Sequence, residues 1–274
     1  MNEGSSRLCG SSDTVKSGRS SKRPDANPLI GQDDCVEIQD RIRKNFEWDL
    51  DDDLHSARAL QQYCSNKKID LWKDESRLVE LQKLDALIKD DLICGREIAI
   101  LGAAVEPGDV VVAIENDAVI IAADGAIGVI SDLNDYHKEK AWRKIRFIVS
   151  DADGDFYHLQ EAARRHIPFI LHAHGDNEDA WFSLLEEISD APSPIILTHQ
   201  TPAPIQGMYN PGGFTDGDRA VCIALSLGVN QENLALYGFR TDKVGKWTGA
   251  TIPEVKMEKL QWMATILDML GVIW

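Results

Sequence analysis

Six short apolar runs, each separated from the next by a helical pattern, constrain the fold of this chain most strongly. All of them follow Gly95, and they span residues 98–101, 118–122, 145–149, 168–171, 195–197 and 234–237. Two of the intervening segments carry apolar stripes with helical spacing: Trp181, Leu184, Leu185 and Ile188; Met257, Leu260, Ala264 and Leu267. Strands that alternate with helices predict an α/β fold in which helices flank a mostly parallel, Rossmann-like sheet. We therefore expect residues 95–274 to form one α/β catalytic domain.

The chain before this domain has a different pattern of charged and apolar residues. Residues 31–94 are charged and helical in pattern, with Ile38, Ile42 and Phe46 spaced by four and with leucines spaced by three at Leu78, Leu81, Leu84 and Leu87. They predict a small helical N-terminal region. Its acidic stretch at 49–53 is expected to be a solvated helix start without a function of its own.

Residues 1–30 are rich in Ser and Gly and almost free of branched apolar and aromatic side chains. Such a segment cannot bury enough surface to offset the entropy cost of ordering it. We expect a disordered tail.

Charge and cysteine content limit the classes of partner. The 274 residues carry 29 Lys and Arg against 45 Asp and Glu, a formal net charge of -16, which opposes binding to nucleic acid and to anionic membranes. The five cysteines include no CxxC pair, which favours a reducing cytoplasm over a disulfide scaffold. The sequence has neither a hydrophobic signal core nor an apolar run long enough to cross a bilayer, so we expect a cytoplasmic protein.

Polar side chains gather just after the expected strands. They are Gly102; Asp124 and Gly125; Asp151, Asp153 and Asp155; His172, His174, Asp176 and Asn177; Thr198 and Gln200; and Gly238. Ligands in open α/β sheets bind at this edge, beyond the carboxyl ends of the strands. Carboxylates crowded together repel one another, and a hard cation such as Mg²⁺ relieves that repulsion. The pattern predicts a metal-dependent enzyme.

Two features of this pattern have simpler alternatives. DADGD resembles the start of a calcium loop, but Phe156 and Ala162 occupy the positions where that loop needs Gly and Glu, which excludes an EF-hand. Asp155 can serve as a helix cap instead of a ligand. Histidines at 172, 174 and 199 suggest zinc, although burial in the sheet or ordinary hydrogen bonding explains them equally, and magnesium is favoured over zinc.

A glycine-rich turn precedes one expected helix. In GGFTDGDRA, Gly212 and Gly213 allow close approach of a ligand, and Thr215 with Asp218 matches a capping box. A nucleotide phosphate could bind at this helix start with Arg219 as its partner, or the motif could be only a well-capped helix. The spacing leaves both interpretations open. Elsewhere, Lys246, Trp247, Lys256 and Lys259 are further candidates for phosphate contact.

Taken together, these motifs resemble the archaeal 6-hydroxymethyl-7,8-dihydropterin pyrophosphokinase family, whose catalytic domain is related to thiamine pyrophosphokinase. The resembling segments are AADGA (122–126), SDADGD (150–155), HAHGDN (172–177), THQ (198–200), GGFTDGDRA (212–220) and KMEKL (256–260). The resemblance covers the chain from about Gly95 to its end. It differs at the turn after the first expected strand, where Gly102 to Val105 replace the family's GxGPSL-like sequence.

The resemblance implies a diphosphokinase that transfers diphosphate from ATP to the hydroxymethyl group of a reduced pterin, yielding AMP, in folate-type or tetrahydromethanopterin biosynthesis. It implies Mg²⁺ as cofactor and suggests a homodimer. The residue roles that it implies are the following: metal ligands Asp124, Asp151, Asp153 and Asp176, the last three also catalytic; ATP contacts Gly212, Gly213, Phe214, Thr215, Asp216, Arg219, Thr198 and Gln200; acceptor contacts Asp124, Gly125, His174 and Asn177.

Three alternatives to this function remain open from the sequence. Thiamine pyrophosphokinase shares the ancestral site, a zinc-dependent hydrolase could use His172, His174 and His199, and a non-catalytic nucleotide-binding module could recruit a partner through the acidic N-terminal helices.

Overall fold

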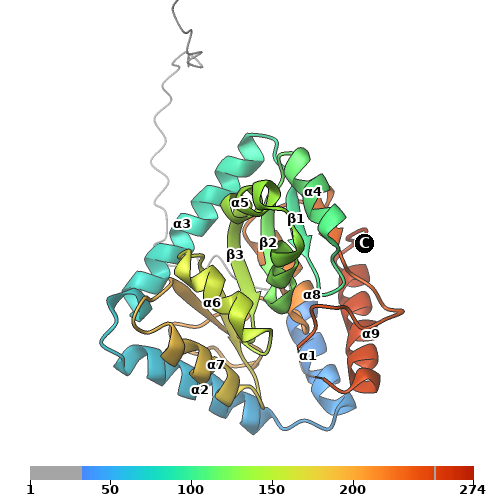
Figure 1. Ribbon diagram of the computed structural model, residues 1–274. Coiled ribbons are helices and arrows are strands. Elements are labelled where there is room, and N and C mark those ends of the chain that lie inside the picture. Colours follow the sequence, from blue (N-terminus) through green and yellow to red (C-terminus); the bar gives the residue numbers. More distant parts are fainter. Residues whose placement is uncertain (1–32, 250) are drawn as a thin grey trace, which may run out of the picture.

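Six parallel strands form the single sheet of the computed structural model, which describes residues 33–249 and 251–274 (Figure 1). The strands are β1 (Ile98–Leu101), β2 (Val119–Ala123), β3 (Ile145–Ser150), β4 (Phe169–Ala173), β5 (Ile195–His199) and β6 (Leu234–Tyr237). Their order is β5-β4-β3-β2-β1-β6, and every neighbouring pair is parallel. The predicted α/β fold is confirmed, with strand boundaries shifted by at most two residues. The tail predicted for residues 1–30 lies outside the described residues.

Helices cover both faces of the sheet, because the strands are apolar on both sides. Successive side chains of a strand point to opposite faces, so Ala99 and Leu101 enter one core while Ile98 and Ile100 enter the other. The first core packs against α2 (Leu50–Asn66), α4 (Pro107–Glu115), α5 (Asp135–Lys144), α6 (Phe156–Arg164) and α7 (Glu178–Glu187). The second packs against α1 (Asp33–Asn45), α3 (Asp74–Ile93), α8 (Asp216–Ser226) and α9 (Pro253–Met269).

The three N-terminal helices pack onto the same sheet. Helix α2 contributes Ala57 and Leu60 to the first core, and it lies beside α7 (Figure 1). Helix α1 contributes Ile38 and Ile42 to the second core, as the sequence spacing predicted. The helical region expected at 31–94 therefore builds part of both cores and is not separated from the sheet.

The leucines spaced by three lie in a helix, as predicted, but they do not share one environment. Leu81 and Leu84 are buried, whereas Leu78 and Leu87 are 44% and 45% exposed. A spacing of three falls behind the 3.6-residue turn of an α-helix, so a row of residues three apart rotates off the buried face within a few turns. The buried face continues instead through Ile88.

Several expected helix starts are present. The carboxylate of Asp155 accepts hydrogen bonds from the backbone N–H groups of Tyr157 and His158 and caps α6, while Thr215 and Asp218 form the predicted capping box of α8. Asp49 caps α2. Asp53, one turn later, has a buried side chain. The expectation that the whole acidic stretch at 49–53 is solvated is therefore wrong at this residue.

Within the described residues, no helix combines the length and the apolar character that crossing a membrane requires.

A buried cluster of ion pairs connects α3 to the sheet. Arg146 of β3 donates two hydrogen bonds to Asp91, at 2.7 and 2.8 Å, and Arg96 donates a third at 2.8 Å. Burial alone would raise the pKa of Asp91, but these hydrogen bonds outweigh it and lower that pKa. The ionised carboxylate is therefore the stabilising form.

We expect Asp91→Asn to lower the free energy of unfolding at pH 7 by about 2 kcal/mol, as the loss of hydrogen bonds to a charged group does. Because the folded pKa lies below the unfolded value of about 3.9, the deficit is complete above pH 5 and shrinks as pH falls below about 4. Urea unfolding at pH 7, 5 and 3 measures it. Asp117→Asn is the control, since Asp117 pairs with the same Arg96 but is 66% exposed, and it should change stability little.

Candidate active site

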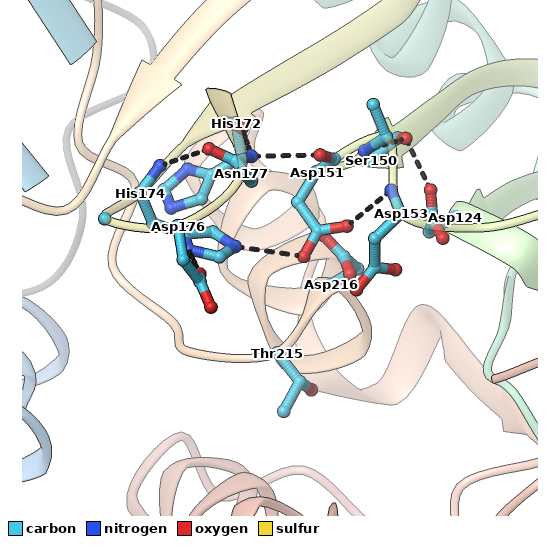
Figure 2. Close-up of polar contacts among 12 residues, drawn as sticks. Asp124, Ser150, Asp151, Asp153, His172, His174, Asp176, Asn177, Thr215 and Asp216 are labelled. Atoms are coloured by element: carbon cyan, nitrogen blue, oxygen red, sulfur yellow. Dashed lines mark hydrogen bonds and ion pairs between the residues drawn. The ribbon is translucent and has the colours of Figure 1, made fainter. Parts of the chain in front are cut away.

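Three carboxylates converge at the carboxyl edge of the sheet. Asp124 follows β2, and Asp151 and Asp153 follow β3; each offers an oxygen that lies within 4.8 Å of the other two. Figure 2 shows Asp216, the first residue of α8, directed toward the same group. The parallel register of β2 and β3 produces this arrangement, since it places the ends of neighbouring strands together. We call Asp124, Asp151 and Asp153 the acidic cluster.

The backbone around Asp124 holds its carboxylate in place. Asp124 has a left-handed φ of 44° and is buried, and the hydroxyl of Ser150 donates a hydrogen bond of 2.5 Å to it (Figure 2). Gly125 cannot carry a side chain, because a Cβ there would collide with the backbone carbonyl of Trp247. Gly125 therefore allows the loop after β6 to approach the cluster, and its predicted contact with the acceptor stays a prediction.

The electrostatics of the acidic cluster favour a bound cation. Burial, followed by repulsion from Asp151, raises the pKa of Asp124 well above its ordinary value and that of Asp153 to about 6. The same two causes raise the pKa of Asp216 to about 8. A divalent cation would remove this repulsion, and carboxylate oxygens are the ligands that hard cations prefer. The donor set therefore fits a divalent metal ion.

His174 lies between two carboxylates. Its Nε2 is 3.2 Å from Asp151, and its Nδ1 is 3.0 Å from Asp176 (Figure 2). Burial would lower the pKa of His174, but the hydrogen bonds to both carboxylates outweigh it and raise that pKa to about 9. The side chain of Asp176 is 92% exposed. The structure thus separates Asp176 from the acidic cluster by one imidazole ring, and its predicted place as a metal ligand stays a prediction.

Asn177 is buried behind the strand ends, where its side chain forms hydrogen bonds with backbone groups. Its amide donates to the carbonyl oxygens of Asp151 and His172, at 2.9 and 2.7 Å, and accepts a hydrogen bond from the N–H of His174. Asn177 thus fixes the ends of β3 and β4 relative to each other, and its predicted contact with the acceptor stays a prediction.

The remaining histidines do not form a zinc site. His172 is fully buried and contacts Thr198, and burial lowers its pKa well below the ordinary value. The Nδ1 of His199 accepts a hydrogen bond from the N–H of Thr201. Across residues 33–249 and 251–274, the acidic cluster is the only group of three or more potential metal ligands that converge.

The predicted ATP contacts divide into those that face a cavity and those that do not. Phe214, Thr215, Asp216 and Gln200 line a cavity of about 370 Å³ that also contains Asp151 and Asp153. Arg219 is buried, and its guanidinium donates to the carbonyl of Phe214 and pairs with Asp216. Thr198 is buried within β5. Both Gly212 and Gly213 have a left-handed φ, where a side chain would collide with Cys35 or Arg219, so these glycines permit close packing.

Positively charged side chains lie on one side of the acidic cluster. Lys256 and Lys259 line the cavity of about 370 Å³, while Arg240 and Lys243 line a smaller one of about 50 Å³ that reaches Asp124. The two lysines were candidates from the sequence, but Arg240 and Lys243 were not. A basic residue in a loop gives no sequence signal that distinguishes it from a solvated one. The arrangement can bind a polyanion beside a metal ion.

The sequence of this chain is similar to those of three archaeal proteins. No protein-family profile matches the chain. The chain is 28% identical over 243 residues to a protein of Pyrococcus furiosus, covering 84% of this chain and 90% of that protein, and 27% identical over 244 residues to one of Methanocaldococcus jannaschii, covering 84% and 91%. A protein of Methanothermobacter thermautotrophicus is 36% identical over 123 residues, 45% of this chain and 47% of that protein. Each is named 6-hydroxymethyl-7,8-dihydropterin pyrophosphokinase.

The acidic cluster predicts a metal-dependent thermal shift. After chelation, saturating MgCl₂ or MnCl₂ should raise the Tm by about 5 °C or more, because a ligand that binds only the folded state stabilises it. Asp153→Asn should abolish most of this shift. Without metal its Tm should equal or exceed that of the wild type, since the substitution removes a like charge.

Asp155→Asn is the matched control for this measurement. Asparagine caps a helix as well as aspartate does, and Asp155 lies outside the acidic cluster. The control should keep both the Tm and its metal shift. An equal loss of the shift in the Asp153 and Asp155 variants would contradict the assignment.

Proposed function

We propose, on the premise that the chain is a homologue of the archaeal 6-hydroxymethyl-7,8-dihydropterin pyrophosphokinases, that it transfers diphosphate from ATP to the hydroxymethyl group of 6-hydroxymethyl-7,8-dihydropterin. The products are AMP and the pterin diphosphate. The observation that carries this proposal is the acidic cluster at the sheet edge, beside a cavity lined by lysines. Diphosphoryl transfer needs both, since the transferred group is a polyanion that binds with a metal ion.

Mg²⁺ is the proposed cofactor. Asp124, Asp151 and Asp153 would hold it, because three carboxylate oxygens that lie within 4.8 Å of one another match the preference of a hard cation for oxygen ligands. When bound, Mg²⁺ neutralises phosphate charge and orients the transferring group. Asp216 lies beside the acidic cluster and is a further candidate for contact with the metal or its water.

The chain's own residues have distinct proposed roles in the reaction. The acceptor hydroxyl oxygen forms a bond to the β-phosphorus of ATP, and the bond from that phosphorus to the oxygen bridging it to the α-phosphate breaks, so that AMP leaves. Lys256 and Lys259 face the cavity and attract the phosphates. We assign acceptance of the hydroxyl proton to Asp176, whose carboxylate lines this cavity and is oriented by His174.

The wider setting follows from the proposed reaction. A pterin diphosphate is an intermediate on the route to folate-type or tetrahydromethanopterin cofactors, and we propose that the protein acts on that route in the cytoplasm. The homodimer that the family resemblance suggests is part of the same proposal. Sedimentation of the purified protein tests it.

The decisive assay uses ATP, Mg²⁺ and the reduced pterin. We expect equimolar AMP and pterin diphosphate, resolved by chromatography and mass spectrometry. Release of ADP would overturn the diphosphoryl assignment. Turnover with thiamine in place of the pterin would identify a thiamine pyrophosphokinase, and ATP binding without turnover of either acceptor would indicate a non-catalytic module.

Asp151→Asn tests the acidic cluster in catalysis. It removes the carboxylate of the acidic cluster that contacts His174, and we expect kcat to fall at least about a hundredfold, as happens when one electrostatic contributor to the transition state is lost. Circular dichroism should show an intact fold, because asparagine has nearly the same shape. Wild-type kcat in this variant would remove Asp151 from the metal site.

A further inference from the structure

A second cavity lies beside the active site, between the start of α2 and the loop after β4. It has a volume of about 230 Å³. Trp48, His174 and Asp176 line both this cavity and the larger one that contains Asp151 and Asp153. A molecule in the second cavity is therefore adjacent to the acidic cluster without occupying the phosphate side. We call it the α2 cavity.

Trp48 forms an aromatic wall of the α2 cavity. Phe46 stacks against Trp48 with ring centroids 4.8 Å apart, and Phe214 packs against it at 5.9 Å. These contacts hold the indole in a fixed place, although it is 37% exposed. A rigid, partly exposed indole at a cavity wall suits a flat heterocyclic ligand, because aromatic rings pack favourably in offset or edge arrangements.

Charge separates the α2 cavity from its neighbour. Apart from His174, its charged side chains are all carboxylates, and among the described residues neither lysine nor arginine lines it: Glu47, Asp49, Asp52, Asp53 and Asp176. The neighbouring cavity holds Lys256 and Lys259, and the ammonium group of Lys259 lies over the Trp48 ring, 5.0 Å from its centroid, at the boundary between the two cavities. A triphosphate is repelled from the acidic side and attracted to the basic one. The α2 cavity therefore suits the acceptor, a neutral ring rich in N–H donors.

The hydrogen bonds of the described residues show which carboxylate is available. Asp53 accepts hydrogen bonds from Arg43, Gln200 and the N–H of Gly175, which occupies both of its oxygens. Asp49 caps α2. Within the described part of the chain, the carboxylate of Asp52 has neither a hydrogen bond nor an ion pair, and the residue is exposed at the cavity.

We infer that the α2 cavity binds the pterin ring of the acceptor, with Trp48 packing against the ring and Asp52 accepting hydrogen bonds from its amino and amide N–H groups. This inference rests on the proposed function, which supplies the identity of the acceptor. The N–H groups lie at the opposite end of the pterin from the hydroxymethyl group. Binding of that edge at Asp52 directs the hydroxymethyl group toward Asp151 and Asp153.

Steady-state kinetics of four variants of the full chain test this inference. Asp52→Asn should raise KM for the pterin at least about tenfold, which corresponds to the loss of one hydrogen bond to a charged group, while KM for ATP stays unchanged. Trp48→Ala should do the same, and Trp48→Phe should retain most of the affinity because it keeps an aromatic ring. Asp51→Asn is the control, since Asp51 is an exposed neighbour outside the α2 cavity, and both KM values should be those of the wild type.

A binding measurement separates this inference from the proposed function. The fluorescence of oxidised 6-hydroxymethylpterin, titrated without ATP, reports ring binding in the wild type and in each variant. If the wild type turns over the pterin while Asp52→Asn and Trp48→Ala keep its KM and its binding, the α2 cavity is not the acceptor site and the proposed function stands. If the wild type neither binds nor turns over the pterin, the proposed function fails, and the inference fails with it. A rise in KM for ATP equal to that for the pterin also overturns the inference.

Discussion

The repulsion among the carboxylates at one sheet edge is the constraint on which the rest of the site depends. Asp124, Asp151 and Asp153 are brought together by the parallel pairing of β2 and β3, which the apolar cores on both faces stabilise. Folding thus places like charges where they cost free energy, and only a cation or protons can relieve that cost. A fold that keeps such a cluster does so at a functional site more often than elsewhere.

Positively and negatively charged side chains lie on different sides of the acidic cluster. Basic side chains of the loop after β6 and of α9 lie on one side, and the carboxylates at the start of α2 lie on the other. In the proposed reaction, this asymmetry gives an anionic and a neutral substrate separate places beside one centre. It also explains how a chain with a net charge of -16 can attract a polyanion, since a few local cations provide the attraction.

Buried hydrogen bonds connect the acidic side to the scaffold. Asp53 of α2 joins Arg43 of α1 to Gln200 after β5 and to Gly175 after β4. These partners are up to 147 residues away from it in sequence. The network fixes the N-terminal helices against the strand ends, so the wall that Trp48 forms has a defined position relative to the acidic cluster.

The sequence by itself determined the strands, the helix caps at Asp155 and Thr215, and the position of Asp124, Asp151 and Asp153 after strands, because these depend on local periodicity and on the rule that parallel strands end at one edge. It also identified the family resemblance, which three archaeal relatives confirm. Only the tertiary structure decided that Asp53 is buried, that Arg219 is used internally and that Trp48 faces the site. Those outcomes depend on contacts between distant segments, and the local pattern of an acidic helix start or a loop tryptophan is the same whether or not such contacts form.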